Sequence, residues 1–514
     1  MTLPSRVIDV FKQISGSSNV LTDAEDILVY SCDRIYCLHP ALNVKAVIRT
    51  ESQEQIKEIL ETCSKEGIPA ARYEKYTDPG SVQPVVLVDD RKQPLLEPTA
   101  EPAADSVNLK KFQETAIGSL KHALGLKLKL DNRPTSKCSE CDLCSSYCTV
   151  APSFNGIETW SAKGRIMLTR AVMGDTLPVS SKASDVIFNC SLCGLCFANC
   201  LPDSETHEAI RAVRYHIALK GLTPPSVEEA AENISRVGDP SGTLPAKRLS
   251  WLKQNPELTK LRPQTKAPVL YWIGCTVATR TENTPRAVTS ILSHAGVDFT
   301  TLGEQEGCCG YILLASGLWN KAEENAKQLI ERIEATGADT IITSCSGCYY
   351  TFSKLFPRIL NIDFPFDVFH TSQYIKNLLR DGLLDLGRID ATKITYHDPC
   401  SLGRHSGVYE DPREVLKKIP GLHLAEMRLN RKRARCCGGG GGLWTINNRV
   451  SLNTGIDRLQ EDVVPLKADA LVTACPICQL NLRFASLRSR VSIRILDFAE
   501  AVESSLLNSD QSGQ

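Results

Sequence analysis

The chain has 514 residues, of which 42% are hydrophobic and 23% charged, and this length suggests roughly three or four folding units. Lys and Arg together number 59, as do Asp and Glu, so no charge excess favours nucleic acid as a partner. No run approaches the roughly 20 apolar residues that a spanning helix needs, and the start, MTLPSRVIDVFKQ, lacks the apolar centre of a signal peptide. We therefore expect a cytoplasmic protein without a transmembrane segment.

The 21 cysteines are the most informative feature of the composition. In a chain without an export signal, closely spaced cysteines indicate metal ligation rather than a disulfide framework. Two short runs and two longer repeats account for all of them except Cys32, Cys37 and Cys63. These three have no cluster spacing, and we treat them as ordinary thiols.

The N-terminal part is expected to be a small α+β segment. Residues 20–71, VLTDAEDILVYSCDRIYCLHPALNVKAVIRTESQEQIKEILETCSKEGIPAA, are similar to the opening of the FAD-binding domain of lactate and glycolate oxidases. Those enzymes continue into a glycine-rich loop for the flavin pyrophosphate, whereas this chain continues with RYEKYTDPGSVQPVVLVDDRKQP. The resemblance therefore implies a truncated FAD-binding-like segment at 1–95 without FAD. The stretch EPTAEPAAD lies in a predicted linker at 96–134.

Two cysteine runs of identical spacing follow the linker. CSECDLCSSYC and CSLCGLCFANC both have the pattern C-x2-C-x2-C-x3-C, and Pro202 follows the second run. In this pattern three thiolates of one tight loop bind one cubane, while the fourth binds the other cubane. The spacing predicts two [4Fe-4S] cubanes, one on Cys138, Cys141, Cys144 and Cys200, the other on Cys190, Cys193, Cys196 and Cys148.

Zinc is the alternative occupant of these runs, but its usual signature separates two C-x2-C pairs by a longer loop. The segments 153–174 and 207–221 have helical patterns. We therefore predict an all-α, ferredoxin-like 2×[4Fe-4S] domain at 135–255. Two cubanes that share crossed ligands are suited to an electron relay.

The C-terminal half repeats one order of cysteines. The first copy has PVLYWIGC, EGCCG and TIITSCSGC, and the second has KITYHDPC, ARCCGGGGG and ALVTACPIC. The first set is Cys275, Cys308, Cys309, Cys345 and Cys348, and the second is Cys400, Cys436, Cys437, Cys475 and Cys478.

β-rich runs such as PVLYWI and ALVTA precede the cysteines, and helical patterns lie between these runs. This alternation predicts βαβ units with a mostly parallel sheet, in domains at 265–388 and 389–514. The protein as a whole is thus expected to be a multidomain α/β protein. Cysteines at the carboxyl ends of strands should converge in the crevice where such sheets bind ligands.

Two adjacent cysteines cannot easily face one tetrahedral ion, so each set favours a larger inorganic core. Glycines beside the CC pairs, namely Gly310, Gly438 and Gly439, would let the backbone approach that core closely. A phosphate cradle is the rival interpretation of the glycines, but no Lys-Ser or Lys-Thr pair follows them. A zinc site or a redox dithiol remains the alternative for the cysteines.

The arrangement C…CC…C-x2-C, present twice, resembles the duplicated CCG domain of heterodisulfide reductase, and a ferredoxin run followed by a CCG pair is similar to the fused D subunit of that enzyme. The resemblance covers roughly residues 135–500 and includes NISRVGDPSG and HDPCSLGRHSGVYEDPREVLKKIPG. Similar chains serve as iron–sulfur subunits of glycolate oxidase, FAD-linked D-lactate dehydrogenase and anaerobic glycerol-3-phosphate dehydrogenase. The resemblance implies a noncubane [4Fe-4S] cluster on each five-cysteine set, with all ten cysteines catalytic in reductive disulfide cleavage.

Two features depart from the family pattern. Ser401 follows Cys400 where relatives frequently have histidine, which weakens the expectation of a proton donor there. The approach to Cys436, RLNRKRAR, is strongly basic, and it is either a solvated face or a docking patch for an acidic partner or anionic substrate.

Three functions follow from these patterns. The first is an oxidoreductase subunit that passes electrons between an FAD-linked 2-hydroxy-acid dehydrogenase, acting on lactate or glycolate, and an electron-transfer flavoprotein, a membrane quinone or cytochrome, or a disulfide. Such a protein would be cytoplasmic or peripheral at the inner face of the membrane. The second is a catalytic thiol–disulfide reductase, which the two complete five-cysteine sets favour. The third is a zinc-stabilised interaction scaffold.

Overall fold

The computed structural model describes residues 3–31, 44–50, 52–72, 85–89, 138, 141–249, 266–390 and 392–509. Cys32, Cys37 and the predicted linker at 96–134 lie outside the described residues. Within the described part, three separate four-stranded sheets form. Among the described helices, none combines the length and the apolar character needed to cross a bilayer.

The N-terminal unit has a sheet in the order β1-β2-β4-β3. Only the β1–β2 pair is antiparallel. Its core packs Phe11, Ile48, Ile59 and Cys63 together, and burial raises the pKa of Cys63 to about 11. The elements are α1 (Ser5–Ser15), β1 (Val20–Leu21), α2 (Ala24–Ser31), β2 (Val44–Arg49), α3 (Gln53–Lys65), β3 (Ala70–Arg72) and β4 (Val85–Asp89).

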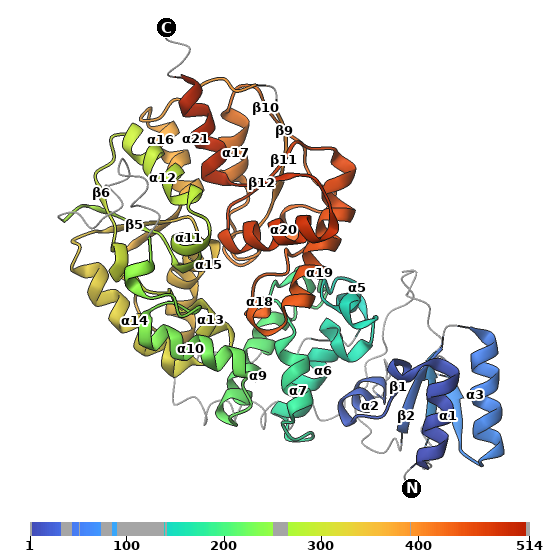
Figure 1. Ribbon diagram of the computed structural model, residues 1–514. Helices are drawn as coiled ribbons and strands as arrows, with labels where there is room; N and C mark the ends of the chain where they lie inside the picture. Colours follow the sequence, from blue (N-terminus) through green and yellow to red (C-terminus); the bar gives the residue numbers. More distant parts are fainter. Residues whose placement is uncertain are drawn as a thin grey trace.

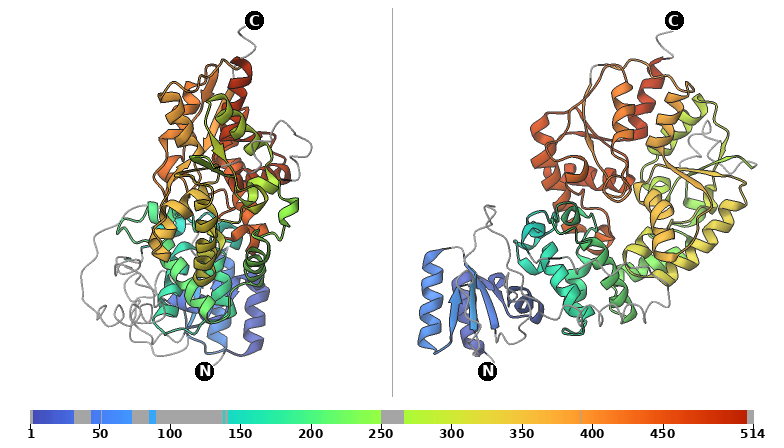
Figure 2. Two further views of the ribbon diagram at one scale, coloured as in Figure 1. Left: turned by 90° about the vertical axis from the view of Figure 1, so that its left-hand side faces the viewer. Right: turned by 180° about the vertical axis from the view of Figure 1, so that it is seen from behind.

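Helix α2 attaches this unit to the next part of the chain. The Thr159 hydroxyl donates to Asp26 Oδ1 at 2.5 Å, the Ser180 hydroxyl donates to Glu25, and Val29 packs in the same core as Trp160. Figure 2 shows the N-terminal unit beside the helical region at one end of the molecule.

The described residues 141–249 contain helices and no strand. Helices α6 and α9 pack against each other, and Leu168, Phe188 and Val213 are in their shared core. The elements are α5 (Leu143–Ser146), η3 (Ala151–Phe154), η4 (Glu158–Trp160), α6 (Ala162–Met173), α7 (Ser181–Phe188), α8 (Leu195–Ala198), α9 (Thr206–Leu219), α10 (Pro225–Val237) and η5 (Pro245–Lys247).

The first cysteine-rich copy is a sheet in the order β6-β5-β7-β8 with all strands parallel. The central strand β5 is buried at every position, as is typical of a parallel sheet that is covered on both faces. The elements are β5 (Val269–Trp272), α11 (Cys275–Arg280), α12 (Asn283–His294), β6 (Phe299–Thr300), η8 (Gly303–Gln305), α13 (Tyr311–Ala315), α14 (Trp319–Glu334), β7 (Thr340–Thr343), α15 (Ser346–Tyr350), η9 (Thr351–Leu360), β8 (Asp367–His370) and α16 (Thr371–Arg380).

The second copy repeats this topology with the order β10-β9-β11-β12, again all parallel. The prediction of βαβ units and parallel sheets is therefore confirmed. The elements are β9 (Thr392–His397), α17 (Glu410–Lys418), β10 (Leu422–Leu424), η10 (Arg431–Arg433), α18 (Leu443–Ile446), α19 (Asn448–Arg458), η11 (Leu459–Val463), η12 (Val464–Leu466), β11 (Ala470–Thr473), α20 (Pro476–Ser489), β12 (Arg494–Asp497) and α21 (Phe498–Ser509).

One hydrophobic core joins the two copies. Tyr271 and Ile342 of the first sheet are in the same buried cluster as Tyr396 and Val472 of the second, and α12 packs against α21. Figure 1 shows the two copies side by side, with the helical region below both. The carboxyl ends of the central strands carry the cysteines described next.

Candidate metal centres

Each five-cysteine set is built on the carboxyl ends of parallel strands. Cys275 begins α11 just after β5, and Cys345 precedes α15 after β7. In the second copy Cys400 follows β9, and Cys475 precedes α20 after β11. The CC pairs lie in the loops that lead into α13 and α18. The topology therefore brings each set to one edge of its sheet.

The thiols of the first set form one connected group. Cys308 hydrogen bonds with Cys275 and with Cys309, and Cys348 hydrogen bonds with Cys309 and with Cys345. The hydrogen bond with Cys308, together with burial, raises the pKa of Cys275 well above the usual thiol value. Cys309 behaves oppositely, because hydrogen bonds with Cys308 and Cys348 lower its pKa to about 6.

The second set has the same connections. The Cys437 and Cys478 Sγ atoms are 3.1 Å apart, Cys436 hydrogen bonds with Cys400 and Cys437, and Cys475 hydrogen bonds with Cys478. Hydrogen bonds with Cys436 and Cys478 hold the pKa of Cys437 well below the usual thiol value. Within each CC pair the second cysteine is thus the one favoured as a thiolate, the form that binds metals, and hydrogen bonds with Cys345 and Cys478 hold the pKa of Cys475 well below the usual thiol value as well.

Two further thiol contacts connect these sets to their surroundings. Cys345 of the first set hydrogen bonds with Cys475 of the second. Cys436 of the second set hydrogen bonds with Cys193 of the helical region, and both side chains are in one small buried cluster with Leu195. The cysteines thus form a continuous series from the helical region through the second set to the first.

The cysteines of the two short runs lie among the helices α5 to α9. Burial raises the pKa of Cys144, with smaller contributions from Cys196, Cys138 and Cys148. Burial also raises the pKa of Cys148, and Cys190 adds to the effect. These contacts group five of the eight cysteines, whereas Cys141 is exposed and Cys200 accepts a hydrogen bond from the Ser204 N–H at 3.3 Å.

The three predicted glycines lie against the CC pairs. The Gly310 N–H donates to Cys308 Sγ at 3.4 Å, the Gly438 N–H to Cys436 Sγ at 3.3 Å, and the Gly439 N–H to Cys437 Sγ at 3.4 Å. Hydrogen bonds to ligand sulfurs are a known means of tuning iron–sulfur centres. The glycines therefore act on the cysteine sulfurs.

One buried arginine, Arg214, contacts all three parts around the cysteines. Arg214 is fully buried and donates to the carbonyls of Cys190 (2.6 Å), Ala315 (3.0 Å) and Gly441 (2.7 Å), which lie in the helical region and in the first and second copies. Burial lowers the pKa of Arg214 to about 10. Its Nη donors thus hydrogen bond to one backbone carbonyl in each of the three parts.

The basic stretch before Cys436 is only partly available for a partner. Arg431 donates to Glu410 at 2.5 Å, and Arg435 pairs with Glu461, while Lys432 and Arg433 are exposed. Ser401, the departure from the family pattern, is 7% exposed and hydrogen bonds with Tyr311. Two of the five basic residues of the stretch therefore have a structural role within the second copy, while Arg428, Lys432 and Arg433 are exposed.

Sequence reasoning missed His397. Its ring, Cys437 Sγ and Cys478 Sγ offer ligand atoms that all lie within 4.8 Å of one another, and all three residues are buried. The available signal was its place in HDPC, three residues before Cys400, because histidine is a common metal ligand.

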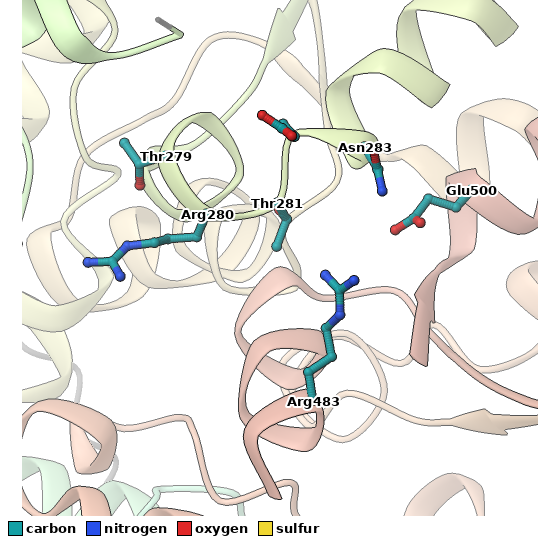
Figure 3. A pocket seen from close by; sticks show the side chains of 7 residues that line it. Thr279, Arg280, Thr281, Asn283, Arg483 and Glu500 are labelled. Carbon is teal, nitrogen blue, oxygen red and sulfur yellow. The ribbon is translucent and has the colours of Figure 1, made fainter. Parts of the chain in front are cut away.

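A polar pocket lies between the two copies, and no cysteine is among the residues that line it. It has a volume of about 220 Å³ and is lined by Thr279, Arg280, Thr281, Glu282, Asn283, Arg483 and Glu500. Figure 3 shows Arg483 of α20 extending toward Asn283 and Glu500. Helix α11 begins with Cys275 and helix α20 carries Cys478, so the pocket is flanked by one helix from each site.

Comparison with known proteins agrees with this geometry. The CCG cysteine-rich domain matches residues 269–353 and 394–483. The D subunit of the dihydromethanophenazine:CoB–CoM heterodisulfide reductase of Methanosarcina barkeri is 28% identical over 387 residues, 72% of this chain and 93% of the relative.

Two other relatives are longer proteins. The probable iron–sulfur-binding oxidoreductase FadF of Bacillus subtilis is 26% identical over 66% of this chain and 48% of its own length. The EtfAB:quinone oxidoreductase of Syntrophomonas wolfei is 28% identical over 62% of this chain and 46% of its own length. The resemblance inferred from the cysteine pattern is confirmed, because the chain carries the CCG cysteine-rich domain twice and is similar over most of its length to D subunits of heterodisulfide reductase at about 28% identity.

Proposed function

We propose that the chain is the electron-transfer subunit of an oxidoreductase that passes electrons between an FAD-linked 2-hydroxy-acid dehydrogenase and a quinone, flavoprotein or disulfide acceptor. The observation that carries the proposal is the pair of contacts Cys193–Cys436 and Cys345–Cys475. They join three groups of cysteines that are far apart in sequence, in one buried series. A binding or structural role alone would not require the groups to touch.

The residues present fit iron–sulfur centres. In the helical region the two cubanes would be held by Cys138, Cys141, Cys144 and Cys200 and by Cys190, Cys193, Cys196 and Cys148, and each five-cysteine set would hold a noncubane cluster. When bound, such centres supply one-electron redox chemistry. The chain itself contributes N–H donors to the sulfurs, as Gly310 and Gly438 do, and burial that limits solvent access.

The partners are proposed from the relatives and the N-terminal unit. A relative named as an EtfAB:quinone oxidoreductase favours an electron-transfer flavoprotein or a membrane quinone among the acceptors. The N-terminal segment that resembles an FAD-binding domain favours a flavoprotein dehydrogenase as the donor. With such partners, the protein would act in the cytoplasm or at the inner face of the membrane.

Metal analysis of anaerobically purified protein tests the proposal. Four four-iron clusters give about sixteen iron atoms and as many acid-labile sulfides per chain. Zinc in place of iron would favour the scaffold function instead, for which His397, Cys437 and Cys478 form a suitable donor group. An iron-free protein that stays colourless after anaerobic reconstitution would remove the proposal.

Catalytic disulfide reduction is the second candidate, and the polar pocket between the helices α11 and α20, each of which carries a cysteine of one set, favours it. Arg280 and Arg483 offer two cationic partners to a carboxylate-bearing disulfide, although Glu282 and Glu500 balance their charge, and the two complete sets meet at Cys345 and Cys475. Mixing the reduced protein with a small dicarboxylate disulfide tests this candidate. Thiol release that Arg483→Gln slows through a higher KM supports catalysis, and the absence of thiol release leaves only the relay.

A further inference from the structure

His397 is a buried imidazole whose ring faces sulfur rather than a well-placed hydrogen-bond partner. It is the last residue of β9 and is 1% exposed, and among the described residues neither ring nitrogen hydrogen bonds to a nitrogen or an oxygen, while the Cys437 thiol lies against the ring. Leaving a buried polar group unpaired costs about 1–3 kcal/mol. Such a group in a native fold calls for an explanation by an ion or another ligand.

The geometry around His397 offers that explanation. A ring nitrogen lies within 4.8 Å of both Cys437 Sγ and Cys478 Sγ, and these two sulfurs are 3.1 Å apart. Metal bonds of roughly 2.0 Å to nitrogen and 2.3 Å to sulfur allow three such atoms to share one metal. The three side chains come from β9, from the loop before α18 and from α20, so they converge although they are separate in sequence.

The first copy has no counterpart to this imidazole. In the sheets, His397 pairs with Thr473, and Trp272 pairs with Thr343. Each threonine lies two residues before the cysteine that follows its strand, so Trp272 and His397 occupy equivalent positions. An indole only donates and cannot bind a metal, and Trp272 packs edge-on against Phe352 with ring centres 5.1 Å apart.

We propose that His397 is a nitrogen ligand of the metal centre held by the second cysteine set, so that the two copies hold chemically different centres. This inference rests on the proposed function, in which both sets bind iron–sulfur clusters. A neutral imidazole donates less charge to iron than a thiolate does, and histidine ligation raises the reduction potential of known clusters. The centre next to Cys193 therefore has a higher reduction potential than an all-cysteine centre would have.

Pulsed electron paramagnetic resonance of protein labelled with 15N-histidine tests the ligand directly. The second-set signal, selected by redox titration, should show a strong 15N hyperfine coupling. His397→Ala should remove that coupling and shift the reduction potential of the second-set signal, while the first-set signal keeps its potential. A wild-type protein without strong 15N coupling overturns the inference, whether or not the variant folds, as does coupling that persists in His397→Ala.

His370→Gln is the matched control. His370 is equally buried, but its Nδ1 contacts Ser372 Oγ at 2.9 Å and its Nε2 contacts the Ala474 carbonyl at 3.0 Å. The strong coupling should therefore survive in this variant, and its loss here would contradict the assignment to His397. Iron and sulfide contents of the same samples separate the two proposals, because a protein without iron ends the proposed function, whereas iron without 15N coupling ends only this inference.

Discussion

The two CCG copies have the same sheet and the same five cysteines, but the residues around the cysteines differ. In the first copy, Glu306 accepts hydrogen bonds from the N–H groups of Ile273 (2.9 Å) and Gly274 (2.6 Å) and pairs with Arg248. In the second copy the corresponding carboxylate is Asp398, which follows the last residue of β9 and pairs with Arg413. The two copies therefore share the same cysteine ligands but differ in the ion pairs around them. Residues that surround the ligands of a metal centre tune its properties.

The copies also differ in position along the series of thiols. The second set touches both the helical region, through Cys193, and the first set, through Cys345. The first set is connected to the second by the Cys345–Cys475 contact. The cysteines of the second copy therefore lie in the middle of this series of thiols, and those of the first copy lie at its end.

The largest expected difference between the two copies appears when one cysteine of each set is replaced by alanine. Cys348→Ala should abolish the first-set paramagnetic signal and about four of the sixteen iron atoms, and it should leave the cubane signals intact. Cys436→Ala should disturb the second-set signal and also the cubane that includes Cys193, because the two thiols are in contact. Iron analysis and electron paramagnetic resonance measure both. Loss of the cubane signals alone in Cys348→Ala would contradict the ligand assignment.

The next largest difference between the copies should appear in the free energy of unfolding, when the buried ion pair of each copy is broken. Glu306→Gln leaves Arg248 buried without its partner, and the expected loss is about 3–5 kcal/mol in the free energy of unfolding. Asp398→Asn should cost less, since Arg413 keeps Glu426, whose Oε1 lies 2.7 Å from Arg413 Nε. Denaturant unfolding under anaerobic conditions compares the two. The surface pair Lys327–Glu323 is the control, and Glu323→Gln should change stability by less than about 1 kcal/mol.

The sequence predicted the parallel sheets and the strand-end cysteines because both depend on local patterns. Apolar runs such as PVLYWI and ALVTA end at cysteines, and parallel strands place their carboxyl ends along one edge. The CC pairs were recognisable for the same reason, since adjacent residues stay adjacent in any fold. The close approach of the glycine N–H groups to the cysteine sulfurs was predictable as well, because Gly310 and Gly438 follow the CC pairs directly.

Contacts between separate units could not be predicted in this way. The Cys193–Cys436 contact and the three carbonyls around Arg214 depend on how the helical region packs against both copies. Spacing reports which ligands share a loop, but it carries no information about which loops meet. His397 escaped notice because a single histidine in a strand is ordinary, and only the sheet register shows that Trp272 replaces it in the first copy.

A smaller difference is expected when alanine replaces the first glycine after each CC pair. Both Gly438 and Gly310 have a positive φ, +93° and +82°, which costs an L-residue about 1–2 kcal/mol. In Gly438→Ala the new Cβ would also meet the Ser451 carbonyl oxygen at 2.3 Å, whereas in Gly310→Ala it would meet the flexible Asn325 Nδ2 at 3.0 Å. Thermal unfolding should therefore rank Gly438→Ala as the more destabilised variant, and equal losses would show that the second-copy backbone can shift.

The smallest expected difference is in pH dependence, at the end of the edge strand of each copy. In the first copy, burial lowers the pKa of His370 from 6.5 to about 4. Between these values the unfolded chain binds a proton that the folded chain does not, so stability is complete above pH 6.5 and falls by about 1.4 kcal/mol per pH unit below it. His370→Gln should remove this slope.

The second copy has Asp497 at the corresponding place, and burial raises its pKa well above 3.8. Here the folded chain holds a proton that the unfolded chain releases, so stability falls as pH rises past 3.8. Asp497→Asn should therefore raise the melting temperature at pH 7. His370→Gln should give no such gain at this pH, because His370 is largely neutral there in both the folded and the unfolded chain. Melting curves of the wild type and both variants from pH 5 to 7.5 measure the opposing slopes. Parallel pH profiles of the two variants would show that the strand ends of the two copies are electrostatically equivalent after all.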